Sequence, residues 1–185
     1  MVAIAVYCAS AEGIDPWYTG LATQVGTELA ARGHSLVTGG GRVSMMGAVA
    51  QAARAGGAHT LGVIPEALRY REDADLECDE LIFTATMRER KAHMDDRADA
   101  FLALPGGIGT LEELFEVWTS GTHAMHDKPV VVLDPEGYYA PLLEWIGQLV
   151  KDGFVRESAL RRLRIVTTVA DALDACEDAL EARTG

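Results

Sequence analysis

Short apolar runs alternate with segments of helical periodicity along this chain. The apolar runs span residues 2–8, 34–38, 59–64, 81–84, 100–104, 130–133 and 164–167. The segments with a helical pattern span 16–32, 45–55, 86–98, 110–119, 138–151 and 169–182. Apolar strands of four to seven residues that alternate with helices predict an α/β fold, in which a parallel sheet is covered by helices on both faces.

Glycine and proline mark the boundaries of these elements. Asp15 before Pro16 is typical of a helix start, because aspartate caps free amides and proline suits the first helical position. Gly33 is expected to end this helix, and Pro65 is expected to break the third strand. No repeat, low-complexity tract or linker divides the 185 residues, so we expect one domain over 1–185.

The charge of the chain limits its partners. Apolar residues make up 49% and charged residues 24% of the sequence, as in ordinary globular proteins, but the formal net charge is −12. Such a chain repels polyphosphate backbones, so we expect no nucleic-acid polymer as a partner. A small phosphorylated ligand remains compatible, because a local nest of backbone amides can hold it.

Cysteine and histidine spacing indicates neither a disulfide framework nor a metal site. The three cysteines, Cys8, Cys78 and Cys176, are scattered and form no CxxC pair. His123 and His126 are three residues apart without a third ligand nearby, so we expect no metal. The apolar N-terminus has no basic leader and is too short to span a membrane, which predicts a cytoplasmic protein without membrane association.

Two glycine-rich loops follow predicted strands, at 39–41 and 106–109. Ligands of parallel sheets bind beyond the carboxyl ends of the strands, so both loops are candidate walls of a site. The second loop opens a helix, whose free amides favour a phosphate. The expected phosphate site comprises Gly106, Gly107, Gly109 and Thr110, with Gly39, Gly40 and Gly41 as a second wall. By themselves, the glycines fit a tight turn without a ligand equally well.

Familiar phosphate-binding motifs do not match this loop. The string GxxxxGK[ST] does not occur in the chain. The dinucleotide motif GxGxxG is only half met, because Glu112 occupies the position of the third glycine. The loop therefore belongs to neither class, and its neighbouring carboxylates need an explanation of their own.

Glu113 has a structural and a functional interpretation. Thr110-x-x-Glu113 fits a capping box, which contributes about 1 kcal/mol to helix stability, and spacing alone favours this structural role. The apolar stripe of the same helix comprises Leu111, Leu114, Phe115 and Trp118. Glu113 lies opposite this stripe, so we expect it to face solvent or a cleft rather than the core.

Arg90 occupies an apolar position of the helix predicted at 86–98. The apolar seam through residues 87, 94, 98 and 101 passes through position 90, and a buried guanidinium requires an anionic partner. A purely structural ion pair would satisfy that requirement. Because this helix leads into the strand before the second glycine loop, Arg90, Lys91, the amides and the glutamates can also converge on one pocket.

Together these motifs resemble the Lonely Guy family of cytokinin riboside 5′-monophosphate phosphoribohydrolases, whose signature is PGGxGTxxE. The similarity rests on Arg90-Lys91 and PGGIGTLEE (105–113), and it extends along nearly the whole chain. Further matching segments are VYCAS (6–10), Pro16-x-Tyr18, TGGGRVSMMGAVA (38–50), GVIP (62–65), MRERK (87–91), DAFLALPGG (99–107), HDKPV (126–130), GYY (137–139) and GF (153–154). The sequence SGTHA (120–124) departs from the pattern of many relatives, and Ala9 replaces a frequent glycine.

The resemblance implies a Rossmann-like homodimer that splits a nucleoside monophosphate into free base and ribose 5-phosphate without a cofactor. Pyridoxal phosphate would need a Schiff-base lysine, and no lysine is nominated. Arg90 and Glu113 match the catalytic pair of the family. The residues expected to contact substrate are Ser10, Gly39, Gly40, Gly41, Glu72, Lys91, Gly106, Gly107, Ile108, Gly109, Thr110, Glu112 and Thr119.

These residues support a mechanism for N-glycoside hydrolysis. Breaking the bond builds positive charge on the ribose, which a carboxylate stabilises while it steers or deprotonates water. We expect Glu113 in that role, with Arg90 anchoring the phosphate or the departing base and orienting Glu113. The rival functions are a non-catalytic nucleotide or cofactor carrier on the same fold, a phosphotransferase, and a scaffold protein.

Overall fold

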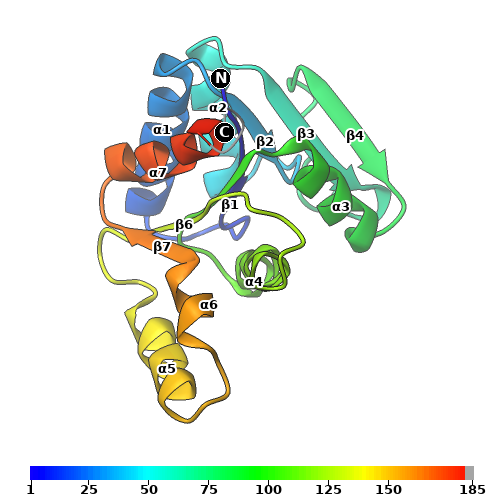
Figure 1. The fold of residues 1–185 in the computed structure, drawn as a ribbon. Coiled ribbons are helices and arrows are strands. Elements are labelled where there is room, and N and C mark those ends of the chain that lie inside the picture. Colours follow the sequence, from blue (N-terminus) through cyan, green and yellow to red (C-terminus); the bar gives the residue numbers. More distant parts are fainter. Residues whose placement is uncertain (182–185) are drawn as a thin grey trace.

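Seven strands form one parallel sheet in the order β4-β3-β2-β1-β5-β6-β7 (Figure 1). The computed structural model describes residues 1–181, so the last residue of the helix predicted at 169–182 lies outside the described residues. The strands are β1 Ala3–Tyr7, β2 Ser35–Thr38, β3 Thr60–Pro65, β4 Glu80–Thr84, β5 Ala100–Ala103, β6 Val130–Leu133 and β7 Leu163–Val166. All seven predicted strands are present, and their parallel pairing confirms the α/β prediction.

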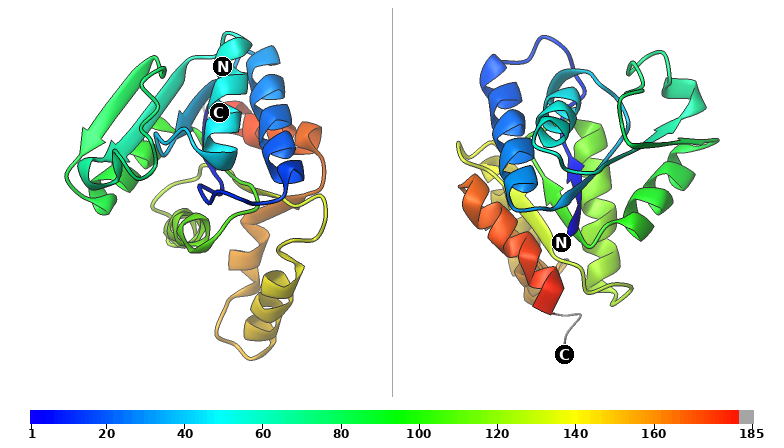
Figure 2. Two further views of the ribbon diagram at one scale, coloured as in Figure 1. Left: turned by 180° about the vertical axis from the view of Figure 1, so that it is seen from behind. Right: turned by 90° about the horizontal axis from the view of Figure 1, so that it is seen from above.

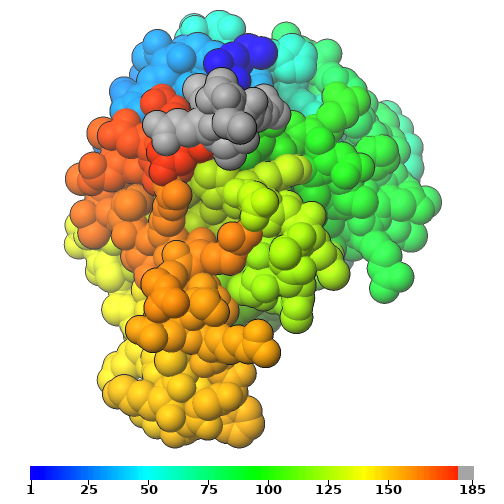
Figure 3. All heavy atoms as spheres, viewed as in Figure 1, coloured from blue at the N-terminus to red at the C-terminus, as the bar shows by residue number. Residues whose placement is uncertain are grey.

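Helices cover both faces of the sheet (Figure 2). They are α1 Pro16–Ala31, α2 Ser44–Ala55, α3 Met87–Arg97, α4 Ile108–Thr122, α5 Ala140–Lys151, α6 Glu157–Arg161 and α7 Val169–Glu181, with a 3₁₀ turn, η1, at Glu66–Leu68. Helices α1, α2 and α7 pack on one face, and α3 and α4 pack on the other. Helix α5 extends from the body of the molecule (Figure 3). No helix of the described residues is long and apolar enough to cross a membrane.

The buried residues form two apolar layers, one on each side of the sheet. Leu29, Val49 and Leu173 come from the three helices of the first face. On the second face, Met94 of α3 and Trp118 of α4 pack against Phe101 of β5. Alternation along the strands sends successive side chains to opposite layers, so even short apolar strands contribute to both.

Several boundaries differ from the sequence predictions by one or two residues, and one helix was not predicted. Pro65 is the last residue of β3 rather than a break before its end, because a missing amide is tolerated where the ladder stops. Helix α4 begins at Ile108, two residues before the predicted start. Helix α6 was missed, because five residues are too few to establish a helical period.

The strand order has a switch point between the neighbouring strands β1 and β5. The chain builds outward from β1 to β4 on one side and from β5 to β7 on the other. Loops that leave the carboxyl ends of two such strands diverge and leave a crevice, which is where ligands bind in Rossmann-like sheets. The loop after β1 and the second glycine loop, after β5, meet at this point.

Candidate active site

A pocket of about 270 Å³ opens at the switch between β1 and β5. It is lined by Cys8, Ala9, Ser10, Ala11, Met46, Glu72, Met87, Arg90, Gly107, Ile108, Gly109, Thr110, Glu112 and Glu113. Segments that are distant in sequence therefore supply one wall each: the loop after β1, the start of α2, the loop after β3, helix α3 and the start of α4. Nine of these residues belong to the predicted site.

The start of α4 presents free backbone amides to this pocket. Gly107 is the N-cap residue, and no side chain caps the helix. The first intrahelical bond joins the amide of Leu111 to the carbonyl of Gly107, at 3.0 Å. The amides of residues 107–110 precede that bond and lie at the positive end of the helix dipole, which suits an anion.

The predicted capping box at Thr110 is wrong. Thr110 lies inside α4 and is buried, so its hydroxyl does not cap the helix and Glu113 is not at the reciprocal position. The reason is a close packing contact: a Cβ at Gly106 would lie 2.1 Å from the Thr110 hydroxyl oxygen. Gly106 thus allows Thr110 to pack against the loop, and the helix starts earlier than the sequence indicates. The structural explanation for Glu113 no longer holds.

Arg90 is buried, as the apolar seam predicted, with 5% of its surface exposed. Its Nε donates to the carbonyl of Val63 at 3.1 Å, and its Nη2 donates to the carbonyl of Gly39 at 3.1 Å. Nη1 lies 3.5 Å from Oε1 of Glu113, and Nη2 lies 4.0 Å from Oε2 of Glu72. The carbonyls of Gly39, just after β2, and of Val63, within β3, therefore fix the guanidinium, which faces two carboxylates.

Among the glycines at 39–41, Gly39 forms a socket for this arginine, and none of the three lines the pocket. A Cβ at Gly39 would lie 1.7 Å from Nη2 of Arg90, so no larger residue fits there without displacing the guanidinium. Gly40 has φ +74°, a conformation that side chains disfavour, and it packs against β3. The loop at 39–41 was predicted to be a second wall of the phosphate site. It does not line the pocket, and it influences the pocket by positioning Arg90.

Glu113 is a buried acid at the rim of the amide site. It is 8% exposed, and burial raises its pKa to about 7 from the ordinary 4.5, against the lowering effect of Arg90. Glu72 is the second carboxylate, and its Oε2 is buried without a hydrogen-bond partner among the described residues. Two carboxylates and one guanidinium thus share a confined space, an arrangement frequent at functional sites.

Lys91 points away from this cluster. Its ammonium group pairs with the carboxylates of Glu112 and Glu116, across the interface between α3 and α4. Among the residues that line the pocket, Glu112 is present and Lys91 is not. The lysine that the resemblance implied as a substrate contact is already neutralised by two acids.

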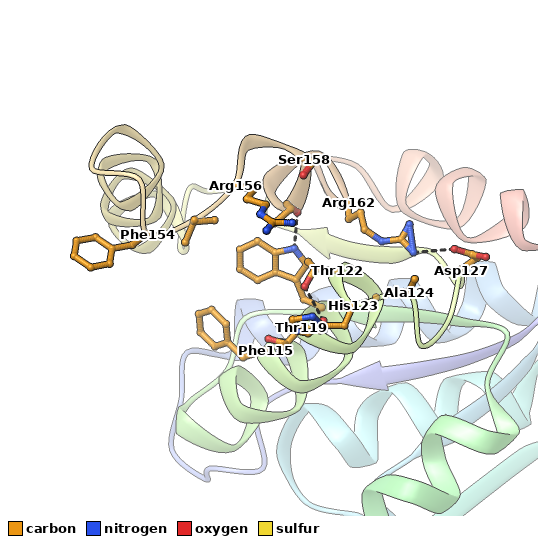
Figure 4. A pocket seen from close by; sticks show the side chains of 14 residues that line it. Phe115, Thr119, Thr122, His123, Ala124, Asp127, Phe154, Arg156, Ser158 and Arg162 are labelled. Atoms are coloured by element: carbon orange, nitrogen blue, oxygen red, sulfur yellow. Dashed lines mark hydrogen bonds and ion pairs between the residues drawn. The ribbon is translucent and has the colours of Figure 1, made fainter.

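Thr119 lies in a different and larger cavity, of about 670 Å³, between α4 and α6 (Figure 4). Phe115, Trp118 and Phe154 form its apolar part, and the indole Nε1 of Trp118 donates to the carbonyl of Ala159 at 2.8 Å. The guanidinium of Arg162 in this cavity is paired with Asp127 at 3.0 Å. The cavity has no buried pair of carboxylate and guanidinium, so the smaller pocket is the better candidate for chemistry.

Several lining residues were missed by sequence reasoning. Cys8, Ala9 and Ala11 line the pocket from the loop after β1, and the rule that ligands bind at a switch point could have identified them. Met46 and Met87 add apolar surface from the starts of α2 and α3, for which no sequence signal was available. In the described part of the chain, no group of three or more histidine, cysteine, aspartate or glutamate side chains has the arrangement of a metal site.

Comparisons with known proteins agree with the motifs. A family model described as "Possible lysine decarboxylase" matches residues 46–176. A cytokinin riboside 5′-monophosphate phosphoribohydrolase from Mycobacterium marinum is 54% identical over 173 residues, covering 94% of this chain and 92% of the relative. The enzyme of the same name from Mycobacterium tuberculosis is 54% identical over 177 residues, with the same two coverages.

A solved structure with the same fold is the molybdenum cofactor binding protein from the phototrophic bacterium Rippkaea orientalis. It superposes with a TM-score of 0.75 and covers 97% of both chains, at 21% identity. At that identity the likeness shows the Rossmann-like fold alone. Because the family model covers more than half of the chain and both enzymes align over nearly its full length, the chain belongs to the Lonely Guy family, whose family model is described as "Possible lysine decarboxylase".

Proposed function

We propose that this protein hydrolyses the N-glycosidic bond of a nucleoside 5′-monophosphate, such as a cytokinin riboside 5′-monophosphate or AMP, to free base and ribose 5-phosphate. One observation carries the proposal: the buried carboxylate of Glu113, facing Arg90, opens into the same pocket as the uncapped start of α4. This arrangement supports a ligand whose phosphate lies at the start of α4 and whose sugar lies beside the carboxylate. The names of the relatives at 54% identity support the same reaction.

The amides at the start of α4 bind the 5′-phosphate and fix the direction of the ribose. Backbone donors at a helix N-terminus hold a phosphate without a basic side chain, and this matters in a chain of net charge −12. The ribose then extends toward Glu113 and Glu72, which line the same pocket. Binding energy from the phosphate positions the reacting bond, so a nucleoside without the phosphate reacts poorly.

Glu113 stabilises the cationic sugar and activates water. As the bond from the ribose C1′ to the base nitrogen breaks, positive charge develops on the sugar ring. The ionised carboxylate offsets this charge and takes a proton from the water, whose oxygen bonds to C1′. The base departs with the bonding electron pair and takes up one proton, and Glu113 releases the proton that it took from water, so that each turnover consumes one water and restores the carboxylate. Arg90 keeps Glu113 oriented through its Nη1, 3.5 Å from the carboxylate.

The family description as a lysine decarboxylase does not fit this site. Pyridoxal phosphate chemistry requires a lysine that reaches the pocket and forms a Schiff base. The sequence has three lysines, Lys91, Lys128 and Lys151, and none of them lines the pocket. Lys91 is paired with two glutamates, and Lys128 donates to the backbone carbonyl of Asp95 at 2.5 Å.

A homodimer is part of the proposal. Thr119 opens on the cavity between α4 and α6 rather than on the Glu113 pocket. The substrate contact that the resemblance implies for Thr119 would therefore come from a second copy of the chain. Phe154, which is 81% exposed beside this cavity, is an apolar surface that such a copy would cover.

The test is release of free base from AMP and from its N6-isopentenyl analogue, compared between wild type and Glu113→Gln. We expect turnover to fall by about 10²-fold or more in the variant, because glutamine can neither accept the proton nor carry the charge. Glu144→Gln is the matched control: it makes the same change at an exposed position of helix α5, on a residue that does not line the pocket, and should retain activity. Absence of base release by the wild-type protein from either nucleotide would instead favour a non-catalytic carrier.

A further inference from the structure

The segment Gly137-Tyr138-Tyr139 folds back over the carboxyl edge of the sheet. Asp134, buried at the end of β6, accepts from the backbone amide of Tyr138 at 2.6 Å and from that of Tyr139 at 2.9 Å. Gly137 has φ +71°, which allows the tight turn. The carboxylate of Asp134 thus fixes both tyrosines relative to β6, the strand beside β5.

Both tyrosine hydroxyls donate to the segment that leads into α4. Tyr139 Oη donates to the carbonyl of Leu104 at 2.7 Å, and Tyr138 Oη donates to the carbonyl of Gly106 at 2.9 Å. The ring of Tyr138 is held edge-on against Tyr139, at 4.9 Å between centroids, and against Tyr18 of α1, at 5.9 Å. These contacts connect β6 to the loop that forms the amide site.

The bond from Tyr138 determines the direction of one pocket amide. In a planar trans peptide, the carbonyl oxygen of one residue and the amide hydrogen of the next point in opposite directions. When Tyr138 holds the Gly106 carbonyl, the Gly107 amide must point away from Tyr138. Gly107 lines the pocket, and in the described structure no side chain caps this end of α4.

We propose that Tyr138 is a positioning residue for the anion site: its hydroxyl orients the Gly106–Gly107 peptide so that the Gly107 amide donates to the 5′-phosphate. This inference rests on the proposed function for the identity of the ligand. Tyr139 has a different role, because its carbonyl partner, Leu104, precedes Pro105, which has no amide hydrogen to orient. Of the two hydroxyls, only that of Tyr138 acts on a peptide whose amide faces the ligand.

Binding of ribose 5-phosphate to Tyr138→Phe tests the inference without any need for catalysis. The readout is the Gly107 amide signal in ¹H–¹⁵N NMR spectra during titration, with ribose as the ligand that lacks phosphate. We expect Kd for ribose 5-phosphate to rise about 5-fold or more in the variant, since a misdirected amide weakens a charge-assisted hydrogen bond. The Gly107 shift should shrink, KM for AMP should rise more than kcat falls, and the melting temperature should stay near that of wild type.

Tyr18→Phe is the matched control, because it removes a hydroxyl from the ring that packs on Tyr138 and should bind as wild type does. A wild-type Kd and a wild-type Gly107 shift in Tyr138→Phe would overturn the inference. A wild-type protein whose Gly107 amide does not respond to ribose 5-phosphate would also overturn it. If the wild type binds through Gly107 in a Tyr138-dependent way yet releases no base from AMP, the proposed function fails while the positioning role stands.

Discussion

At the scale of single residues, the site depends on the carboxylate of Glu113, which is buried although water would stabilise its charge. Burial of Glu113 favours the neutral acid, whereas Arg90 at 3.5 Å favours the carboxylate, and the balance leaves its pKa at about 7. A pKa close to the working pH is favourable for a group that must both accept and release a proton. The backbone carbonyls of Val63 and Gly39 hold the Arg90 guanidinium in place by accepting from its Nε and Nη2.

This balance predicts a pH-dependent activity. If Glu113 acts in its ionised form, kcat/KM for AMP should be low below its pKa and rise about tenfold per pH unit until it levels off above about pH 7. A carboxyl with the ordinary pKa of 4.5 would already be about 90% ionised at pH 5.5, so its activity profile would be nearly flat above that pH. The pH profile of initial rates between pH 5 and 9, at constant ionic strength, measures the effect. A profile that is flat from pH 5.5 to 8 would contradict the assignment of the pKa to Glu113.

At the scale of elements, the loop after β2 and helix α3 act as one unit. The carbonyl of Gly39 accepts a hydrogen bond from Arg90, and the missing side chain leaves room for the guanidinium. The loop therefore positions an arginine that helix α3 supplies. Helices α3 and α4 are joined by the ion pairs of Lys91 with Glu112 and Glu116. The active carboxylate and its arginine therefore come from two helices that are connected to each other.

Gly39→Ala should disrupt this unit. The new Cβ would lie 1.7 Å from Nη2 of Arg90, so the guanidinium must leave its carbonyl partners. We expect the free energy of unfolding to fall by about 1–3 kcal/mol, since buried polar groups lose their hydrogen bonds, and base release from AMP to fall as well. Denaturant unfolding and the activity assay measure both effects.

The matched control is Gly20→Ala, at a helical position of α1 with no atom within 4 Å of the new Cβ. Its unfolding free energy should equal that of wild type or exceed it by up to about 1 kcal/mol, because alanine favours the helix. If Gly39→Ala behaved like Gly20→Ala in both assays, the socket would have no importance for Arg90.

At the scale of the whole molecule, helix α4 contributes to both the Glu113 pocket and the larger cavity. The start of the helix contributes to the Glu113 pocket, and its later turns, from Phe115 to Thr122, line the cavity against α6 (Figure 4). The Glu113 pocket is polar and contains the buried charged groups of Arg90 and Glu113. The larger cavity is bordered by exposed aromatic surface, which is more typical of a contact between proteins than of a catalytic site.

Light scattering should therefore give a mass about twice the 19.8 kDa of one chain. Phe154→Ser should shift the population toward monomer, because it removes an exposed apolar side chain beside the cavity. Tyr70→Ser is the control, since Tyr70 is 88% exposed and does not line that cavity. A monomeric wild-type protein at micromolar concentration would refute the homodimer, and an unchanged dimer in Phe154→Ser would place its interface elsewhere.

The sequence by itself determined the alternation of strands and helices, the position of the glycine loop after β5, and the burial of Arg90. Each of these follows from a local pattern: apolar period, glycine placement, or a charge within an apolar seam. The same local reasoning placed the start of α4 at Thr110 and assigned a capping box to Glu113. That assignment failed because the packing of Thr110 on Gly106 is a contact that no helical period encodes.

Only the tertiary structure decided which of these groups meet. The socket around Arg90 combines Gly39, just after β2, with Val63 of β3, and the pocket adds Glu72 from the loop after β3. Tyr138 reaches the glycine loop because β6 lies beside β5. The physical reason is that strand order brings together residues 32 and 51 positions apart. The distances between them depend on the packing of the whole sheet rather than on any one segment.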